Sequence, residues 1–235
     1  AVTNLTATDV MIDTCTNNFV TMNPLSKDNF TFSQGNLQTD CTASNQGTAL
    51  STISLTTGKW YVEGYINSGH GVGAFGLADA EINANSRQGG FTEFTGDILY
   101  RVDGSAPDTG TNWSAGGIIA LAVDIDNKTY TLKYNNTALR TDESYTSNAE
   151  LFIYTQDTSA SYATGFIFNF GQDSSFAGNK TRQNNSDGNG FGDFYYAPPS
   201  GYLALCTKNL ATALSHTIDD GSAHFQTATY TGNGS

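Results

Sequence analysis

Residues 118–136 read IIALAVDIDNKTYTLKYNN, and this stretch decides the fold. Residues 118–125 are almost entirely apolar, which is typical of a strand buried on both faces. Asp126, Asn127 and Lys128 follow as a turn, because Asp and Asn side chains bond to the nearby backbone. Residues 129–134 then return antiparallel, and the pair at 135–136 ends that strand. The stretch predicts a hairpin with one deeply buried strand.

The rest of the chain continues this pattern, with short apolar runs separated by clusters of Gly, Asn and Asp. No segment keeps an apolar period of 3.6, so the chain is predicted to be all-β. We expect further strands at residues 60–66, 72–78, 98–102, 151–154, 163–170 and 202–206. Residues 30–38 and 48–56 are expected to pair at a sheet edge, 23–25 to form a turn, and 178–193 to be a long polar loop. Strands at this spacing predict a two-sheet antiparallel β-sandwich or jelly roll.

The strand at 60–66 has two distinct faces. Alternation places Trp60, Val62 and Gly64 on one face, and Tyr61, Glu63 and Tyr65 on the other. A large aromatic side chain directly after the Gly58 turn is expected to anchor the core between two sheets.

The composition limits the partners. The 235 residues carry a formal net charge of −12, with only 10 Lys and Arg, whereas nucleic acids and anionic membranes require clustered basic residues. No apolar run approaches the length of a membrane-spanning helix, so membrane insertion is not expected. Because 38% of the residues are hydrophobic and 12% aromatic, the chain can bury a core.

Two acidic segments invite a chemical interpretation. Asp124 and Asp126 share one face of a strand end, where they could form an acid–base pair or a metal site, but the same residues shape hairpin turns, which is the interpretation that we favour. Asp187, Asn189 and Asp193 place oxygen atoms at alternate positions, as calcium loops do, although the bidentate Glu of an EF-hand is lacking. The alternative is a flexible loop rich in Gly and Asn.

A catalytic site is not predicted. The three histidines lack metal-ligand spacing, and no Gly-x-Ser-x-Gly motif is present. A glycanase would require two carboxylates that face each other across a cleft. The candidates for such a pair are Glu63, Glu81, Glu93 and Asp97.

The three cysteines are too few for a disulfide framework, and an odd number leaves at least one thiol free. Cys206 lies in an apolar run and is expected to be buried, while a bridge between Cys15 and Cys41 stays open.

Aromatic side chains in or beside predicted loops are the binding candidates. They are Trp113, Tyr145, Tyr162, Phe191, Tyr195 and Tyr196, with Asn112 beside the first. Rigid amphipathic rings next to polar groups suit sugar or protein surfaces. The alternative is that several of them cap the ends of the sandwich.

Six motifs follow one another in a fixed order. They are GKWYVE at 58–63, VG at 72–73, IIALAVDIDN at 118–127, TLKYNN at 131–136, NFGQ at 169–172 and PPSGYLAL at 198–205. Together they resemble the SPRY family over about residues 19–210. GDFYYAPPSGYLALCTKNL at 192–210 is similar to the SPRY-like modules of bacteriophage tail and fibre proteins, and IDDG, HF and TYTGNGS at 218–235 resemble the stretch that links such a module to the next.

The resemblance implies a concanavalin-like sandwich at residues 1–210 and a C-terminal extension or linker at 211–235, in which 224–230 pairs with the sandwich or with another subunit. It implies a non-catalytic virion protein of tail-fibre or receptor-binding type, located on the phage particle. Its expected partners are other virion proteins, a host-surface glycan or protein, and further copies of itself; no cofactor is expected. The family binds through loops at one end, here 67–71, 103–117 and 155–162. The alternatives are a capsid-decoration or head-fibre protein and a polysaccharide-active enzyme.

Overall fold

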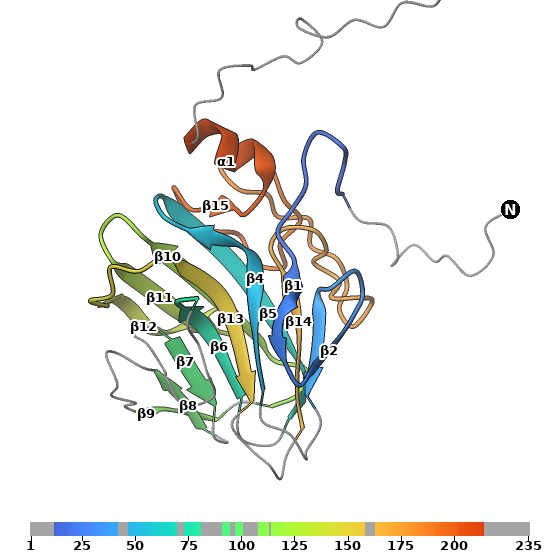
Figure 1. Cartoon of the computed structure of the whole chain (residues 1–235), viewed down its shortest axis with the longest axis vertical. Helices are drawn as coiled ribbons and strands as arrows, with labels where there is room; N and C mark the ends of the chain where they lie inside the picture. Colours follow the sequence, from blue (N-terminus) through green and yellow to red (C-terminus); the bar gives the residue numbers. More distant parts are fainter. Residues whose placement is uncertain are drawn as a thin grey trace, which may run out of the picture.

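Figure 1 shows the computed structural model. It describes residues 12–41, 47–69, 73–80, 91–94, 97–100, 108–112, 114–157 and 163–213. Two antiparallel sheets form a β-sandwich, as the sequence predicts. Within the described residues, no helix is both long and apolar enough to cross a membrane.

The first sheet has seven strands. Their spatial order is β1 (Met22–Asp28), β4 (Gly47–Leu55), β13 (Leu151–Asp157), β6 (Gly73–Ala78), β7 (Phe91–Phe94), β8 (Asp97–Tyr100) and β9 (Asp108–Asn112).

The second sheet has eight strands. Seven of them follow the order β12 (Thr137–Ser144), β11 (Thr129–Tyr134), β10 (Ile118–Asp124), β5 (Lys59–Gly69), β14 (Thr164–Asn169), β3 (Gln38–Cys41) and β2 (Phe30–Ser33). The eighth, β15 (Leu203–Ala204), pairs parallel with β5 beside Trp60 and Tyr61, beyond the point where β14 stops. Helix α1 (Thr207–Ala213) follows it.

The main core lies between the sheets. Trp60 and Val62 of β5 point into it together with Phe166 and Phe168 of β14, and Phe75 packs against both phenylalanines from the opposite sheet. Both faces expected for residues 60–66 are confirmed, because Tyr61 and Tyr65 belong to separate apolar clusters on the outer face of β5.

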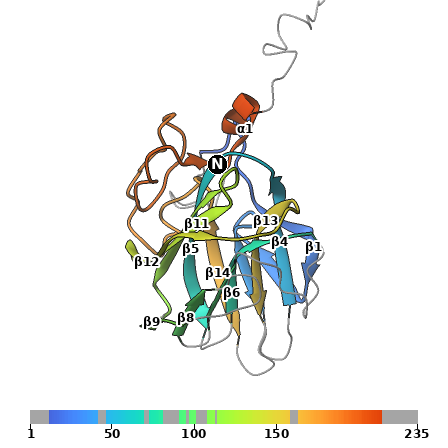
Figure 2. The same ribbon diagram turned by 90° about the vertical axis from the view of Figure 1, so that its left-hand side faces the viewer.

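A long irregular segment covers that outer face. We call residues 171–202, between β14 and β15, the cover segment. Phe176 and Phe194 of this segment are fully buried against Tyr65 and Tyr61, respectively. In Figure 2 the orange chain of the cover segment accordingly lies on the side of β5 that faces away from β4 and β1. Strand β10 is therefore buried on both faces, as its sequence predicts.

Three local expectations are corrected. Residues 30–38 and 48–56 do not pair: β2 and β3 form a hairpin in one sheet, while β4 lies in the other between β1 and β13. The turn expected at 23–25 is a bulge within β1, where the Leu25 amide bonds to the Asn23 side chain. The strand expected at 202–206 is only two residues long, because the Cys206 carbonyl accepts hydrogen bonds from the Asn209 and Leu210 amides, which start α1. The expected boundary between the sandwich and the C-terminal extension, after residue 210, falls within helix α1. Residues 214–235, which include the strand expected at 224–230, lie outside the described residues.

Candidate functional site

The outer face of β5 carries a buried carboxylate, Glu63, which is 0% exposed. Its Oε1 accepts hydrogen bonds from Tyr61 Oη (3.1 Å) and the Tyr196 amide (2.7 Å). Its Oε2 accepts bonds from Asn169 Nδ2 (3.1 Å) and the Tyr195 amide (2.8 Å). Burial raises the pKa of Glu63 to about 7, and the four donors oppose this shift.

Asn169 connects the same carboxylate to the start of the cover segment. Its Nδ2 also donates to the Asp193 carbonyl, and its Oδ1 accepts from the amides of Gly171 and Asp173. Gln172 then donates from Nε2 to the Val20 carbonyl. The NFGQ motif therefore connects β5, the cover segment and the chain before β1 through side-chain hydrogen bonds.

Among the described side chains, Glu63 does not face a second carboxylate across a cleft, which is the arrangement that the enzyme alternative requires. All four hydrogen bonds to Glu63 come from the protein itself, and the carboxylate is enclosed by the cover segment. Glu93 and Asp97 lie on β7 and β8, where the structure describes only the backbone, and Glu81 lies outside the described residues.

The carboxylates of the calcium candidate bond to protein groups. Asp187 uses both carboxylate oxygens to accept protein N–H groups, from the amides of Asn189, Phe191 and Ala204 and from Asn209 Nδ2. Asp193 instead pairs with Arg182, with 2.6 Å between Oδ2 and Nη2. Since N–H donors occupy these oxygens, the loop is stabilised by hydrogen bonds, and no group of three His, Cys, Asp or Glu in the described residues is arranged to hold a metal ion.

The hairpin interpretation of Asp124 and Asp126 is confirmed. Asp124 accepts from the backbone and side chain of Asn127 and pairs with Lys59 at 2.9 Å. Lys59 and Asn127 hold the pKa of Asp124 below its usual value, although burial, the largest influence, acts in the opposite direction. Asp126 accepts from Thr57 Oγ1 and the Gly58 amide, so it joins two turns.

Of the cysteines, Cys41 and Cys206 are buried and Cys15 is exposed, and the structure places none of the three in a disulfide. The bridge that was left open between Cys15 and Cys41 is therefore not formed.

The four aromatic candidates that the structure describes lie in three separate places. Tyr195 and Tyr196 are half-buried on the outer face, edge to face with each other and close to Phe176. Phe191 is half-buried elsewhere in the cover segment, against the cluster of Tyr61 and Phe194. Asn112 ends β9, where only the backbone is described, and Trp113 and Tyr162 lie outside the described residues.

The expectation that Tyr145 is an exposed loop residue is wrong. Its side chain is 4% exposed and belongs to the main core. Its amide donates to the Lys128 carbonyl at 3.0 Å, which holds it against the β10–β11 turn. Burial, together with the nearby Asp124 and Asp126, raises the pKa of Tyr145 to about 12.

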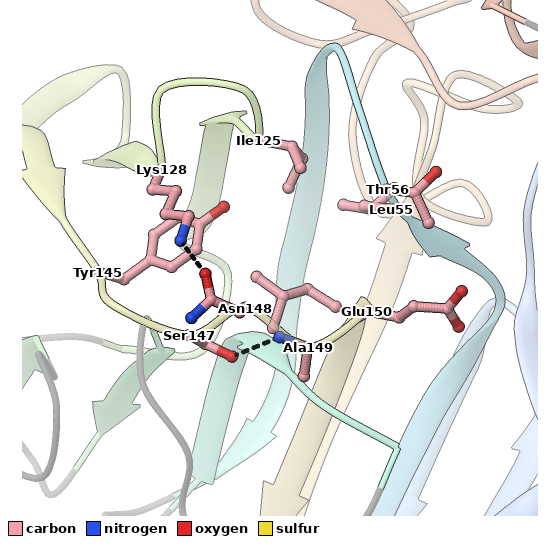
Figure 3. A pocket seen from close by; sticks show the side chains of 10 residues that line it. Leu55, Thr56, Ile125, Lys128, Tyr145, Ser147, Asn148, Ala149 and Glu150 are labelled. Carbon is pink, nitrogen blue, oxygen red and sulfur yellow. Dashed lines mark hydrogen bonds between the residues drawn. The ribbon is translucent and has the colours of Figure 1, made fainter.

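Tyr145 lines a hollow of about 220 Å³ at this end of the sandwich. Figure 3 shows its lining, which comes from the end of β4, the β10–β11 turn and the link between β12 and β13. The lining residues are Leu55, Thr56, Ile125, Lys128, Tyr145, Ser147, Asn148, Ala149, Glu150 and Leu151. We call this site the Tyr145 hollow. Sequence reasoning missed it because its residues come from three separate segments.

The loops expected to bind have other bounds in the structure: residues 67–69 belong to β5, 108–112 form β9, and 155–157 belong to β13. The ends of β5 and β13 nevertheless lie at the end of the sandwich opposite the Tyr145 hollow. Register places Asp157 opposite both Gly73 and Gly47, and Thr164 opposite both Gly69 and Cys41. The described residues that flank positions 42–46, 70–72 and 158–162 are therefore ends of neighbouring strands.

The strands pack closely at this end of the sandwich. A Cβ on Gly73 would lie 2.5 Å from Thr164 Cγ2, and one on Gly165 would lie 2.3 Å from Asp40 Oδ1. A side chain at either position would therefore require the neighbouring side chain to move.

Among solved structures, this chain is similar to SPRY domains. The SPRY domain of human HERC1 shares 13% identity, with 63% of this chain and 96% of that chain covered and a TM-score of 0.47. The TRIM65 PSpry domain shares 11% identity over 63% of this chain and 92% of that chain, with a TM-score of 0.48. A sialidase shares 12% identity over 55% of this chain and 14% of that chain, with a TM-score of 0.43. No protein-family model matches the sequence, and no curated protein is a significant match to it.

Proposed function

We propose that this chain is a non-catalytic adhesion module of a bacteriophage particle, of tail-fibre or receptor-binding type. The phage assignment is supported by the sequence of residues 192–210, which resembles SPRY-like modules of tail and fibre proteins. The binding role is supported by one structural observation: three connections, 42–46, 70–72 and 158–162, are attached to neighbouring strand ends of a closely packed frame.

A sandwich whose strands are joined by several connections at one end suits recognition for a physical reason. Loops tolerate sequence change without unfolding the scaffold, so recognition residues concentrate there. Strands that are fixed by close contacts reduce the entropy lost when such a surface binds. The net charge of −12 favours a glycan or protein partner over a polyanion.

We further propose that the module acts as a homo-oligomer on the particle. Several linked copies turn weak single contacts into firm attachment.

The proposal is tested by exchanging residues 158–162 for a Gly/Ser sequence of equal length. The expected result is at least a tenfold loss of binding to host cells or to arrayed host glycans, while the melting temperature changes little. The matched control is Gln34→Gly in the β2–β3 turn at the other end of the sandwich. Gln34 is exposed and has a φ of 51°, a conformation that glycine adopts without strain. The control should bind normally.

Two outcomes would overturn the proposal. Unmodified protein that binds neither host cells nor any arrayed glycan would remove the adhesion role. Antibody labelling of phage particles that never detects the chain would remove the virion location, whereas labelling of the capsid instead of the tail would favour the decoration role.

A further inference from the structure

The Tyr145 hollow contains a buried hydroxyl with unused hydrogen-bonding capacity. Tyr145 is 4% exposed, and its Oη has no hydrogen-bond partner among the residues that the structure describes. Buried side-chain hydroxyls in native proteins nearly always have a partner, from the protein or from an ordered molecule. A buried hydroxyl without a protein partner beside a hollow is therefore available to bond to a molecule held there, either an ordered water or a ligand.

The hydroxyl is held in place and keeps its proton. The ring is packed in the main core, and the backbone bond from Tyr145 to Lys128 anchors its position. Because burial raises the pKa of Tyr145 to about 12, the group is neutral at physiological pH and can both donate and accept a hydrogen bond.

The chemistry of the lining indicates a neutral ligand with one apolar face. Leu55, Ile125 and Leu151 supply apolar surface beside the Tyr145 ring. The polar lining is mostly uncharged, with Thr56, Ser147 and Asn148, and the two charges, on Lys128 and Glu150, have opposite signs. This combination disfavours an anion or a cation and suits a ring that carries C–H groups on one side and hydroxyls at its edge.

The size of the hollow restricts the ligand further. Its volume of about 220 Å³ lies below the roughly 300–1,000 Å³ of sites for drug-sized ligands. It has room for one six-membered ring with its substituents, and not for an extended chain.

We propose that the Tyr145 hollow binds a single neutral sugar ring, such as the terminal residue of a glycan, with Tyr145 Oη bonded to a sugar hydroxyl. This site lies at the opposite end of the sandwich from connections 42–46, 70–72 and 158–162, so it does not depend on the function proposed for them.

Access requires movement only at the rim. Figure 3 shows Lys128 Nζ bonded to Asn148 Oδ1 beside the Tyr145 ring. Asn148 is exposed, and exposed side chains change rotamer within picoseconds to nanoseconds. Displacing this rim amide would widen the hollow beside the Tyr145 ring, so we expect a sugar ring to enter there.

The test is a titration of the isotopically labelled chain with methyl glycosides of glucose, galactose, mannose and N-acetylglucosamine, followed by amide chemical shifts. At least one sugar should bind at millimolar concentration and shift amides at Lys128 and at 147–151. Tyr145→Phe removes only the hydroxyl and should weaken binding about 2- to 10-fold, the value of one hydrogen bond. Its melting temperature should not fall, because no protein hydrogen bond is lost.

The matched control is Tyr202→Phe, which removes a hydroxyl from a half-buried tyrosine in the cover segment and should leave sugar affinity unchanged. The variant with residues 158–162 exchanged should also retain sugar binding, so the two proposals fail separately. The inference is overturned if no sugar shifts these amides, if Tyr145→Phe binds as tightly as the parent, or if a crystal soaked in sugar shows only water on Tyr145.

Discussion

At the scale of single residues, Glu63 shows how a polar motif can serve the fold. Alternation along β5 predicts that Glu63 points away from the main core, which normally means exposure to solvent. The cover segment removes it from water, and two backbone amides of that segment, from Tyr195 and Tyr196, bond to its carboxylate. A carboxylate in such a place couples folding to pH.

Glu63 should make stability depend on pH. Its pKa is about 7 in the folded state, against 4.5 as the ordinary value, so the folded state holds the proton more tightly between these two pH values. The stabilisation is therefore full below about pH 4.5 and is lost as pH rises through 7, by an amount on the order of 3 kcal/mol. Urea unfolding at a series of pH values should show this decline, and Glu63→Gln should remove it. Parallel pH profiles for the parent and the variant would contradict the assignment.

Gly64 should tolerate no larger side chain. A Cβ at this position would lie 2.9 Å from Phe75 Cε2 in the opposite sheet. We expect Gly64→Ala to lower the free energy of unfolding by about 1–3 kcal/mol, the usual cost of overpacking a core. Part of this loss should be recovered in the double variant with Phe75→Leu, because the smaller side chain vacates the contact. Denaturant unfolding of the two single variants and the double variant measures the coupling, and strictly additive losses would argue against the contact.

At the scale of elements, the cover segment is the part that departs most from a plain sandwich. It lacks regular strands over most of its length, yet its side chains are bonded at closely spaced positions, such as Asp173 to the Ser175 and Ala177 amides and Asp187 to the Asn189 and Phe191 amides. Backbone groups that find no sheet partner must find side-chain partners when they are buried. The abundance of Asn, Asp and Ser in this segment is explained by that need.

Asn169→Ala should loosen the cover segment. The amide makes four buried hydrogen bonds, to Glu63, to the Asp193 carbonyl and from the amides of Gly171 and Asp173. Their loss should lower the free energy of unfolding by about 2–4 kcal/mol, because buried partners are left unsatisfied. Hydrogen exchange of the amides at 193–196 should become faster than that of β10.

The control for this change is Asn179→Ala. Asn179 is exposed, and its side chain donates a single hydrogen bond, to the Phe176 carbonyl, so a loss of at most about 1 kcal/mol is expected. Equal losses for the two alanine variants would show that Asn169 does not hold the segment.

At the scale of the whole molecule, the excess of acidic residues acts on stability rather than on fold. Twenty-two Asp and Glu against ten Lys and Arg leave a net charge of −12, which repels itself more in the compact state than in the extended chain. Salt screens this repulsion, since the Debye length falls from about 30 Å at 0.01 M to about 8 Å at 0.15 M.

The melting temperature should therefore rise with salt, by about 2–4 °C between these two concentrations, which corresponds to about 1 kcal/mol for a chain of this size. Differential scanning calorimetry in NaCl measures it. Calcium chloride at the same ionic strength should give the same value, because N–H donors occupy the Asp187 carboxylate. A fall in melting temperature with NaCl, or an extra rise with calcium, would contradict these assignments.

The fold class, the buried hairpin of β10 and β11, and the two faces of β5 could all be predicted from the sequence. These features depend on local periodicity and turn chemistry, which a short window of residues carries completely. Local patterns also explain the errors: residues 30–38 and 48–56 both alternate, but alternation does not specify the partner strand, which is chosen by contacts between distant segments.

The burial and the hydrogen-bond partners of the polar side chains could be read only from the tertiary structure. Whether Glu63 faces water depends on a segment more than 100 residues away, and Tyr145 is buried because the ends of β4, β10 and β13 meet around it. Burial and the convergence of distant residues are properties of the packed molecule. They set pKa values, hydrogen-bond partners and the hollow, which is why the candidate site could not be derived from the chain alone.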